Sequence, residues 1–160
     1  MERVHALRQG AEYFVYRTLG GVVTAAGWER RRPAAAVPGP WDEAVLAYLT
    51  GGGDALLRQV PVDLTTLSPF AQEILIHTRR LRFGQTATYQ ELAAAAGKPG
   101  GARAAGQALG CNPVPLFIPC HRVLAAGGWG GFSAGLARKR RLLALEGAVR
   151  PAVRRPRSRR

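Results

Sequence analysis

The feature that most constrains the fold is a change in sequence pattern at Ser68-Pro69. Before this point, residues 13–19 and 22–28 are rich in aromatic and β-branched residues and flank the pair Gly20-Gly21, which is typical of a β-hairpin. After it, Ser at the N-cap and Pro at the first helical position mark a helix start. A sheet followed by helices predicts an α/β fold of the α+β type.

We divide the 160 residues into three parts. Residues 1–66 are expected to form a small N-terminal domain with the hairpin, a short helix over 41–49 and a strand over 57–64 that returns to the sheet edge. Residues 67–148 form a second, mainly helical domain. Residues 149–160 hold six arginines and no acidic residue, which predicts a basic, disordered tail that adds nonspecific affinity for phosphates.

Two short helices are predicted inside the second domain. Thr88 and Glu91 have the spacing of a capping box, which begins a helix over 89–96. The glycine-containing segment 97–101 ends it, and a further helix over 102–109 follows at once. This is the helix-turn-helix pattern, although ordinary helical hairpins share it.

The second of these helices presents small residues and one arginine. Its predicted exposed face consists of Ala102, Arg103, Ala105 and Gly106. A smooth surface of this kind lets a helix approach a nucleic-acid groove closely. The same small residues would also allow tight packing against another helix, so the pattern leaves both interpretations open.

The charge balance favours a polyanionic partner. The chain has 23 basic and 10 acidic residues, a formal net charge of +13, and all basic residues except Lys98 and Lys139 are arginine. The arginine fork binds phosphate through two hydrogen bonds, which points to nucleic acid first and to an anionic membrane second. A coding bias towards high GC content is the alternative explanation of the arginine preference.

The two cysteines indicate reduced thiols. Cys111 and Cys120 are close in sequence, the charged N-terminus does not resemble a signal peptide, and no apolar run has the length of a membrane span. We therefore expect a cytoplasmic protein, associated with the nucleoid if it is bacterial, with no membrane partner.

The segment around Cys120 carries the chemistry. Pro119 fixes the backbone before Cys120, and the adjacent His121 and Arg122 are both expected to favour the thiolate, which is a nucleophile. Neighbouring side chains on an extended segment point in opposite directions, so proton transfer between Cys120 and His121 requires a water or a local bend. A free cysteine is also commonly just a small buried apolar residue.

An imidazole that acts as a base needs an acid to orient it. Downstream of residue 63 the only acids are Glu73, Glu91 and Glu146, and Glu91 is already used by the capping box. Glu146 ends a predicted helix over 136–145, where a carboxylate opposes the helix dipole and a cationic partner would explain it. The alternative is an exposed glutamate balanced by nearby arginines.

Other catalytic classes fit poorly. Cys111, Cys120 and His121 do not complete the four ligands of a structural zinc site, so we predict no metal. A cysteine protease would need a histidine distant in sequence with its own Asn or Asp.

At these residues the chain resembles the alkylguanine-DNA alkyltransferases, also called methylated-DNA–protein-cysteine methyltransferases. The resemblance covers residues 67–147. Its motifs, in chain order, are Gly84-Gln-Thr-Ala-Thr-Tyr89, Asn112-Pro-Val-Pro, Ile118-Pro-Cys-His-Arg-Val123, Phe132-Ser-Ala-Gly-Leu136 and Leu142-Leu-Ala-Leu-Glu-Gly147.

The resemblance implies direct-reversal DNA repair. The protein would bind the minor groove, flip an alkylated guanine out of the stack and move the alkyl group irreversibly from guanine O6 to Cys120. It implies that His121 takes the thiol proton through a water, that Glu146 orients His121, and that Tyr89 donates a proton or hydrogen bond to the base. No cofactor is needed, and each molecule reacts once.

The resemblance also assigns the contacts with DNA and base. The DNA-binding residues are Ala102, Arg103, Ala105, Gly106 and Arg122 of the reactive motif, with Arg103 filling the gap left in the stack. The substrate pocket is assigned to Asn112, Val123, Trp129, Phe132 and Ser133. Phe132 stands where the family often has tyrosine, and the glycine-rich loop around Trp129 is this chain's own.

Two other functions remain as alternatives. A non-catalytic protein that binds alkyl lesions would lack the nucleophile, whereas Cys120 is present. A general nucleic-acid packaging protein would bind DNA without regard to the lesion. We expect a monomer that acts on double-stranded DNA carrying alkylated guanine.

Overall fold

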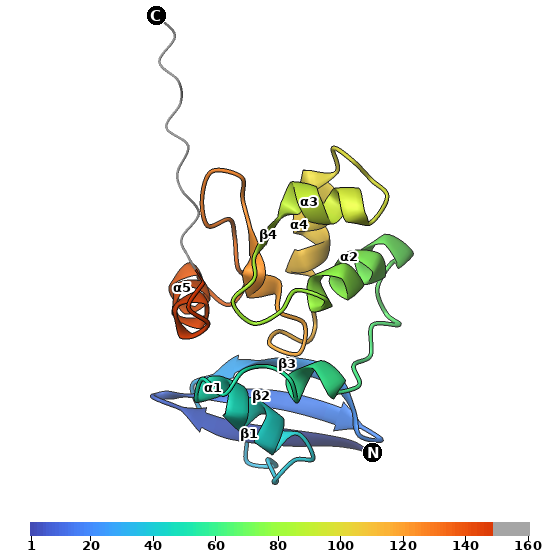
Figure 1. Ribbon diagram of the computed structural model, residues 1–160. Coiled ribbons are helices and arrows are strands. Elements are labelled where there is room, and N and C mark those ends of the chain that lie inside the picture. The colour runs from blue at the N-terminus through green and yellow to red at the C-terminus, as the bar shows by residue number, and fades with distance from the viewer. Residues whose placement is uncertain (149–160) are drawn as a thin grey trace, which may run out of the picture.

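The N-terminal part of the chain is an antiparallel sheet. In the computed structural model, which describes residues 1–148, strands β1 (Glu2–Gln9), β2 (Glu12–Leu19) and β3 (Val22–Glu29) pair in the order β1-β2-β3 (Figure 1). The predicted hairpin is confirmed: Leu19 pairs with Val22, and both glycines between them have positive φ, of 59° and 85°. Such backbone angles are what a two-residue hairpin loop requires.

Strand β1 was missed by the sequence analysis. It is an outer strand whose charged residues face solvent, and its one fully buried side chain is polar His5. The His5 ring lies 4.7 Å from the ring of Tyr16, and its Nε2 is 2.9 Å from Thr18 Oγ1. A strand that buries a histidine carries little hydrophobic alternation, so the pattern gave no signal.

The predicted short helix is confirmed as α1 (Asp42–Leu49), which follows a long loop from the sheet. Trp41 precedes it and donates from Nε1 to the carbonyl of Gly21 at 2.8 Å, so the helix start is fixed to the hairpin turn. The buried side chains of α1 are Ala44, Val45 and Tyr48. This face points Tyr48 into the protein interior.

The strand predicted over residues 57–64 is wrong. The chain there forms a 3₁₀ turn (Leu57–Gln59) and then meets the sheet at a single bridge between Val62 and Val23. Val23 donates to the carbonyl of Pro61 and accepts from Asp63, both at 2.9 Å. The segment does reach the edge of β3, but the 3₁₀ turn shortens the pairing to one residue.

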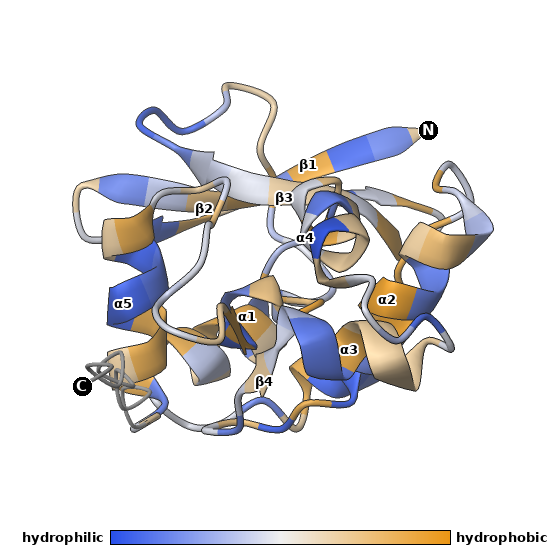
Figure 2. Cartoon of the chain, turned by 90° about the horizontal axis from the view of Figure 1, so that it is seen from above, coloured by the Kyte–Doolittle hydropathy of each residue, from blue (hydrophilic) through white to orange (hydrophobic). Residues whose placement is uncertain are grey.

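The second part of the chain is mainly helical, as predicted. It contains α2 (Pro69–Arg79), α3 (Tyr89–Ala95), α4 (Ala102–Gly110) and α5 (Leu136–Leu145). Helices α3 and α4 pack against each other and against α2, which gives the predicted helix-turn-helix arrangement (Figure 1). Figure 2 shows that α5 is hydrophilic in its middle and hydrophobic towards its ends.

A small parallel sheet brings distant segments together. Strand β4 (Ala87–Thr88) pairs with β5 (Val123–Leu124), which follows the 3₁₀ turn Cys120–Arg122. Tyr89 comes directly after β4. The pairing therefore places Tyr89 beside the turn that carries Cys120.

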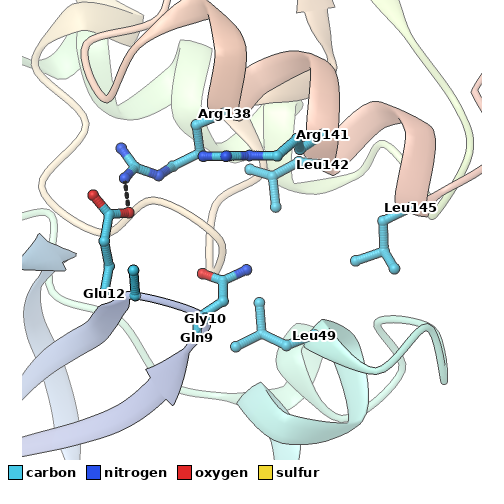
Figure 3. Close-up of a pocket in the computed structure, with 9 residues that line it drawn as sticks. Gln9, Gly10, Glu12, Leu49, Arg138, Arg141, Leu142 and Leu145 are labelled. Carbon is cyan, nitrogen blue, oxygen red and sulfur yellow. Dashed lines mark hydrogen bonds and ion pairs between the residues drawn. The ribbon is translucent and has the colours of Figure 1, made fainter.

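The sheet and the helical part share one buried apolar cluster. Phe117, from the segment before Cys120, lies 6.0 Å from Phe14 and 5.6 Å from Tyr16, measured between ring centroids. Arg138 of α5 pairs with Glu12 at the start of β2 (Figure 3), and its guanidinium stacks on the ring of Trp28 at 4.6 Å.

The predicted division of the chain at residue 66 stays a prediction. The predicted tail, residues 149–160, lies outside the described residues.

The capping box offers a direct test of local stability. Thr88 Oγ1 accepts from Glu91 N at 3.1 Å, and Glu91 Oε2 accepts from Thr88 N at 2.7 Å. Thr88→Ala removes the first bond and should lower the free energy of unfolding by about 1 kcal/mol in urea titrations. Thr66→Ala, at an exposed residue outside the helices, is the control and should change it by less than about 0.5 kcal/mol. Equal losses in both variants would contradict the capping role.

Candidate active site

Cys120 lies on a local bend. An apolar segment ends at Pro119, and residues 120–122 form one 3₁₀ turn before β5. The bend replaces the extended geometry in which neighbouring side chains point in opposite directions. Cys120 is 8% exposed, so only a small part of the residue reaches the surface, through one opening.

That opening is a pocket of about 350 Å³ between α3, α4 and the loop before α5. This volume lies in the usual range for ligand sites, about 300–1,000 Å³. The residues that line it are Tyr89, Gly106, Leu109, Gly110, Cys120, Gly131, Phe132 and Ser133. The cysteine, the small surface of α4 and the aromatic loop residue thus share one cavity.

Glu146 forms the centre of the buried polar network behind Cys120. Its side chain is fully buried, and Oε1 lies 2.6 Å from His121 Nε2. Arg122 donates to both carboxylate oxygens, with Nε 2.9 Å from Oε2, and Gly84 N donates to Oε2 at 3.1 Å. Burial alone would raise the pKa of Glu146, but the bonds from His121 and Arg122 outweigh it and lower the pKa to about 2.

Arg122 is a buried structural residue, which corrects its assignment to the DNA-binding group. It is 2% exposed, and its guanidinium contacts Glu146 on one side and Asp54 on the other, with Nη1 2.8 Å from Asp54 Oδ2. Nη1 also donates to the carbonyl of Leu81 at 2.7 Å. A side chain whose donors are used inside the protein cannot contact phosphate.

The geometry leaves His121 with one nitrogen that can accept a proton. Nε2 faces the ionised Glu146, which favours a proton on that nitrogen. Nδ1 is buried and has no hydrogen-bond partner within residues 1–148. Burial lowers the pKa of His121 below 6.5, and the bond and charge of Glu146 offset this only in part.

In the resting state the side chains of His121 and Arg122 do not lower the pKa of the Cys120 thiol, contrary to our expectation. Burial raises the pKa of Cys120, and a side-chain hydrogen bond from Asn112 and the charge of Lys139 offset this only in part. The charge of Arg122 is directed at Glu146 and Asp54 instead. The resting pair is therefore a neutral thiol beside a neutral imidazole.

Lys139 is a buried cation that the sequence analysis did not place in the site. It projects from α5, and its Nζ donates to the carbonyls of Val123 at 2.6 Å and Gly131 at 3.0 Å. Burial lowers the pKa of Lys139 to about 8, while the negative charge that Cys120 can carry raises it. Lys139 therefore joins the two backbone segments that flank the pocket.

Tyr89 stands at the pocket wall against a glycine loop. Its hydroxyl accepts from Gly131 N at 3.1 Å. Gly130 has a φ of 69°, and a Cβ at this position would lie 2.8 Å from the Tyr89 ring. The loop therefore needs glycine both for its backbone angle and for its closeness to the ring.

The exposed face of α4 differs from the prediction at one residue. Arg103 is exposed, and Ala102 and Gly106 are partly exposed. Ala105 is fully buried against the helical core, so it cannot contact DNA. Its position explains the outcome, because a residue two places after Arg103 on a helix faces away from it.

Two of the five predicted pocket residues, Phe132 and Ser133, line the pocket, and three do not. Asn112 donates to Ile118 O at 3.1 Å, accepts from Val114 N at 3.0 Å, and also bonds the Cys120 thiol from behind the pocket wall. Val123 is fully buried within β5. Trp129 lies on the loop beneath the guanidinium of Arg140, 5.4 Å from the ring centroid.

A separate hollow contains none of the predicted site residues. It has a volume of about 540 Å³ and lies between the β1–β2 turn, the end of α1 and α5 (Figure 3). Leu49, Leu142 and Leu145 supply its apolar wall. Within residues 1–148, no group of three or more His, Cys, Asp or Glu residues is arranged to hold a metal ion, and no helix is long and apolar enough to cross a membrane.

Sequence reasoning missed Tyr48, Asp54 and Lys139. A signal existed for Tyr48, which follows Val45 by three residues and so shares its helix face. Lys139 precedes Leu142 and Leu143 by three and four residues, which is the same signal. Asp54 lies in a loop, where no periodicity could reveal its partner.

Comparisons with known proteins agree on one family. The family model described as 6-O-methylguanine DNA methyltransferase, DNA binding domain, matches residues 69–148. A methylated-DNA–protein-cysteine methyltransferase of Metallosphaera sedula is 43% identical over 90 residues, which are 56% of this chain and 56% of that protein. The human protein of the same name is 54% identical over 68 residues, 42% of this chain and 33% of that protein. The matched segments thus span between a third and just over half of these relatives.

Solved structures match over nearly the whole chain. The O6-methylguanine methyltransferase of Mycobacterium tuberculosis superposes with a TM-score of 0.78 at 30% identity, over 95% of this chain and 96% of that chain. The M. tuberculosis OGT solved in complex with DNA has a TM-score of 0.78 at 29% identity, over 93% and 95%. These likenesses include the N-terminal sheet, which the family model does not cover.

The buried carboxylate should make stability dependent on pH. Glu146→Gln leaves Arg122 and His121 buried beside a neutral group, so we expect the free energy of unfolding at pH 7 to fall by about 3–5 kcal/mol in urea titrations. Because the pKa of Glu146 is lowered to about 2, its contribution is complete above pH 4.5 and is lost as the pH falls towards 2. The difference between wild type and variant should therefore narrow at pH 3.

Glu73→Gln is the matched control. The Glu73 side chain is 58% exposed, and its ion pair with His77 Nε2 is long, at 3.9 Å. This substitution should change stability by less than about 0.5 kcal/mol. A loss of similar size in both variants, or a Glu146→Gln loss that stays constant down to pH 3, would contradict the buried network.

Proposed function

This chain belongs to the 6-O-methylguanine DNA methyltransferase family, and on that basis we propose that it repairs DNA by moving an alkyl group from guanine O6 to Cys120. One observation supports this most directly: Cys120 opens into a pocket while the His121–Glu146 pair lies behind it. The curated relatives carry the name of this activity. The reaction is a direct reversal, and each protein molecule acts once.

The proposed alkyl transfer needs no cofactor, because no electrons are gained or lost overall. The thiol proton of Cys120 passes through a bridging water to His121 Nδ1, and Sγ attacks the methyl carbon on O6. The carbon–sulfur bond forms as the carbon–oxygen bond breaks, and the electron pair returns to guanine. Tyr89 donates a hydrogen bond to the leaving guanine, which takes a proton from water. The imidazolium of His121 then releases the former thiol proton to water, so the net change is one proton moved from thiol to base.

The network suits this proton transfer. Glu146 stays ionised because its pKa is about 2, so it stabilises the imidazolium rather than taking its proton. His121 is neutral at physiological pH and can act as a base. The charge of Lys139 favours the thiolate as it forms.

We propose that α4 enters the minor groove and that Arg103 fills the gap left by the flipped guanine. Support comes from the exposure of Arg103 beside the partly exposed Ala102 and Gly106, from the net charge of +13 and from a related OGT solved with DNA. The partner is double-stranded DNA carrying alkylated guanine, bound by a monomer inside the cell. The basic segment 149–160 would add salt-sensitive affinity.

Two rival functions are less well supported. A protein that only binds alkyl lesions would not need a nucleophile in the pocket, yet Cys120 lines it, with the His121–Glu146 pair buried behind. A packaging protein would need neither the pocket nor the buried network.

Intact-mass measurement tests the reaction. After incubation with DNA containing O6-methylguanine, the wild-type chain should gain one methyl group, and peptide mapping should place it on Cys120. Cys120→Ala should gain nothing and still bind DNA. Cys111→Ser, at the exposed second cysteine, should react like wild type. Tight binding to the lesion with no change in mass would contradict the repair function.

The role of Arg103 can be separated from the chemistry. Arg103→Ala should slow methyl transfer from duplex DNA about tenfold, equivalent to about 1.4 kcal/mol, and leave transfer from a single-stranded oligonucleotide nearly unchanged, because no stacked gap must be filled there. Gln107→Ala, one turn further along the exposed side of α4, is the control. Equal slowing on both substrates would refute the role in flipping.

A further inference from the structure

We propose that Tyr48 is a positioning residue through which the N-terminal part of the chain holds His121 in its proton-accepting form. The inference rests on the proposed function, and it assigns to that reaction a residue outside the segment that the family model matches, 69–148. Tyr48 links α1 to the buried network at Glu146.

Tyr48 reaches the network from α1, whereas Arg122 reaches it from the turn that carries Cys120. Its side chain is buried, at 1% exposure, and projects from the inner face of α1. The hydroxyl donates to Glu146 Oε1 at 2.7 Å and lies 3.1 Å from His121 Nε2. The rings of Tyr48 and His121 are 6.2 Å apart, and Phe83 packs edge-on against Tyr48 at 6.0 Å.

The direction of these hydrogen bonds is determined by the carboxylate. An ionised Glu146 can only accept, so the Tyr48 proton points at Oε1. Burial and the charge of Glu146 raise the pKa of Tyr48, so the hydroxyl keeps its proton at every pH at which the reaction would run. The Tyr48 oxygen then turns its lone pairs towards Nε2 of His121.

His121 Nε2 therefore faces two acceptors, Glu146 Oε1 at 2.6 Å and the Tyr48 oxygen at 3.1 Å. Both require a proton on Nε2, which leaves Nδ1 unprotonated in the neutral ring. Because Tyr48 also donates a hydrogen bond to Oε1, it offsets part of the negative charge that this oxygen presents to His121. Tyr48 thus fixes the tautomer and limits how strongly Glu146 can stabilise the imidazolium.

The other charged or titratable groups around His121 do not replace this hydroxyl. Arg122 and Lys139 are cations that lower the pKa of the imidazole, and Cys120 is its proton donor. Asp54 pairs with the far side of Arg122. Among these groups and Tyr48, only Tyr48 contacts both Nε2 of His121 and the oxygen to which Nε2 donates.

Tyr48→Phe removes the hydroxyl and keeps the ring. Since Oε1 at 2.6 Å is the nearer acceptor for Nε2, the loss of a donor to Oε1 outweighs the loss of the second acceptor. Oε1 still accepts from Arg122, but with one donor fewer it presents more negative charge to the imidazole, which raises the pKa of His121. The acid limb of the pH–rate profile for methyl transfer should move to higher pH by about 0.5–1 unit. At pH values on this limb, below the pKa of His121, the variant should therefore react about three- to tenfold more slowly than wild type.

Tyr16→Phe is the matched control. Tyr16 is also fully buried in the N-terminal part, and its hydroxyl also donates to a carboxylate, Asp42 Oδ1, at 2.8 Å. Its other partner is Trp41 N, not His121. This variant loses a comparable hydrogen bond, so it reports the purely structural cost and should keep the wild-type pH profile.

The experiment measures single-turnover rates against pH for the full-length wild type and both variants. In parallel, NMR titration of ¹⁵N-histidine-labelled protein follows the imidazole of His121 without any need for activity. A shift to higher pH in Tyr48→Phe alone, seen in both measurements, supports the proposal. No shift, a shift to lower pH, or the same shift in Tyr16→Phe overturns it. If wild type transfers no methyl group, the proposed function fails, while the titration still decides whether Tyr48 controls His121.

Discussion

A carboxylate buried without contact to water is the constraint on which the rest of this structure depends. Glu146 must be surrounded by donors, because an unpaired buried charge would cost several kcal/mol. The chain supplies them from three separate segments: the end of α1 (Tyr48), the loop before β4 (Gly84) and the turn after Pro119 (His121 and Arg122). All three meet the carboxylate at the end of α5. The same contacts that stabilise the charge also fix the orientation of the imidazole of His121, the residue next to Cys120.

The N-terminal sheet therefore does more than cover the helical part. The fixed position of α1, with Trp41 bonded to the hairpin turn, aims Tyr48 at Glu146. Strand β3 also contacts the pocket, because the ring of Trp28 packs against the ring of Phe132 with centroids 6.4 Å apart. The N-terminal part of the chain thus supports two regions: the His121–Glu146 pair through Tyr48, and the pocket through Trp28.

The sequence predicts those features that local rules determine. The glycine hairpin, the capping box at Thr88 and the succession of sheet and helices follow from turn angles, capping hydrogen bonds and periodicity, and the structure confirms them. The contact between His121 and Glu146 was expected from the resemblance, and the role of each stays a prediction. Asp54 and the burial of Arg122 could not be foreseen, because an ion pair between residues 68 positions apart leaves no local pattern. The burial of Ala105 shows the same limit, since small residues fit both a groove and a core.

The central claim is that buried hydrogen bonds hold His121 with its proton on Nε2, so that Nδ1 accepts the proton of Cys120. A long-range ¹H–¹⁵N NMR spectrum of the imidazole in wild-type protein at pH 7.5 observes the tautomer directly. We expect a neutral ring with a protonated Nε2 and an unprotonated Nδ1. A proton on Nδ1, whether in the other neutral tautomer or in a doubly protonated ring, would contradict it.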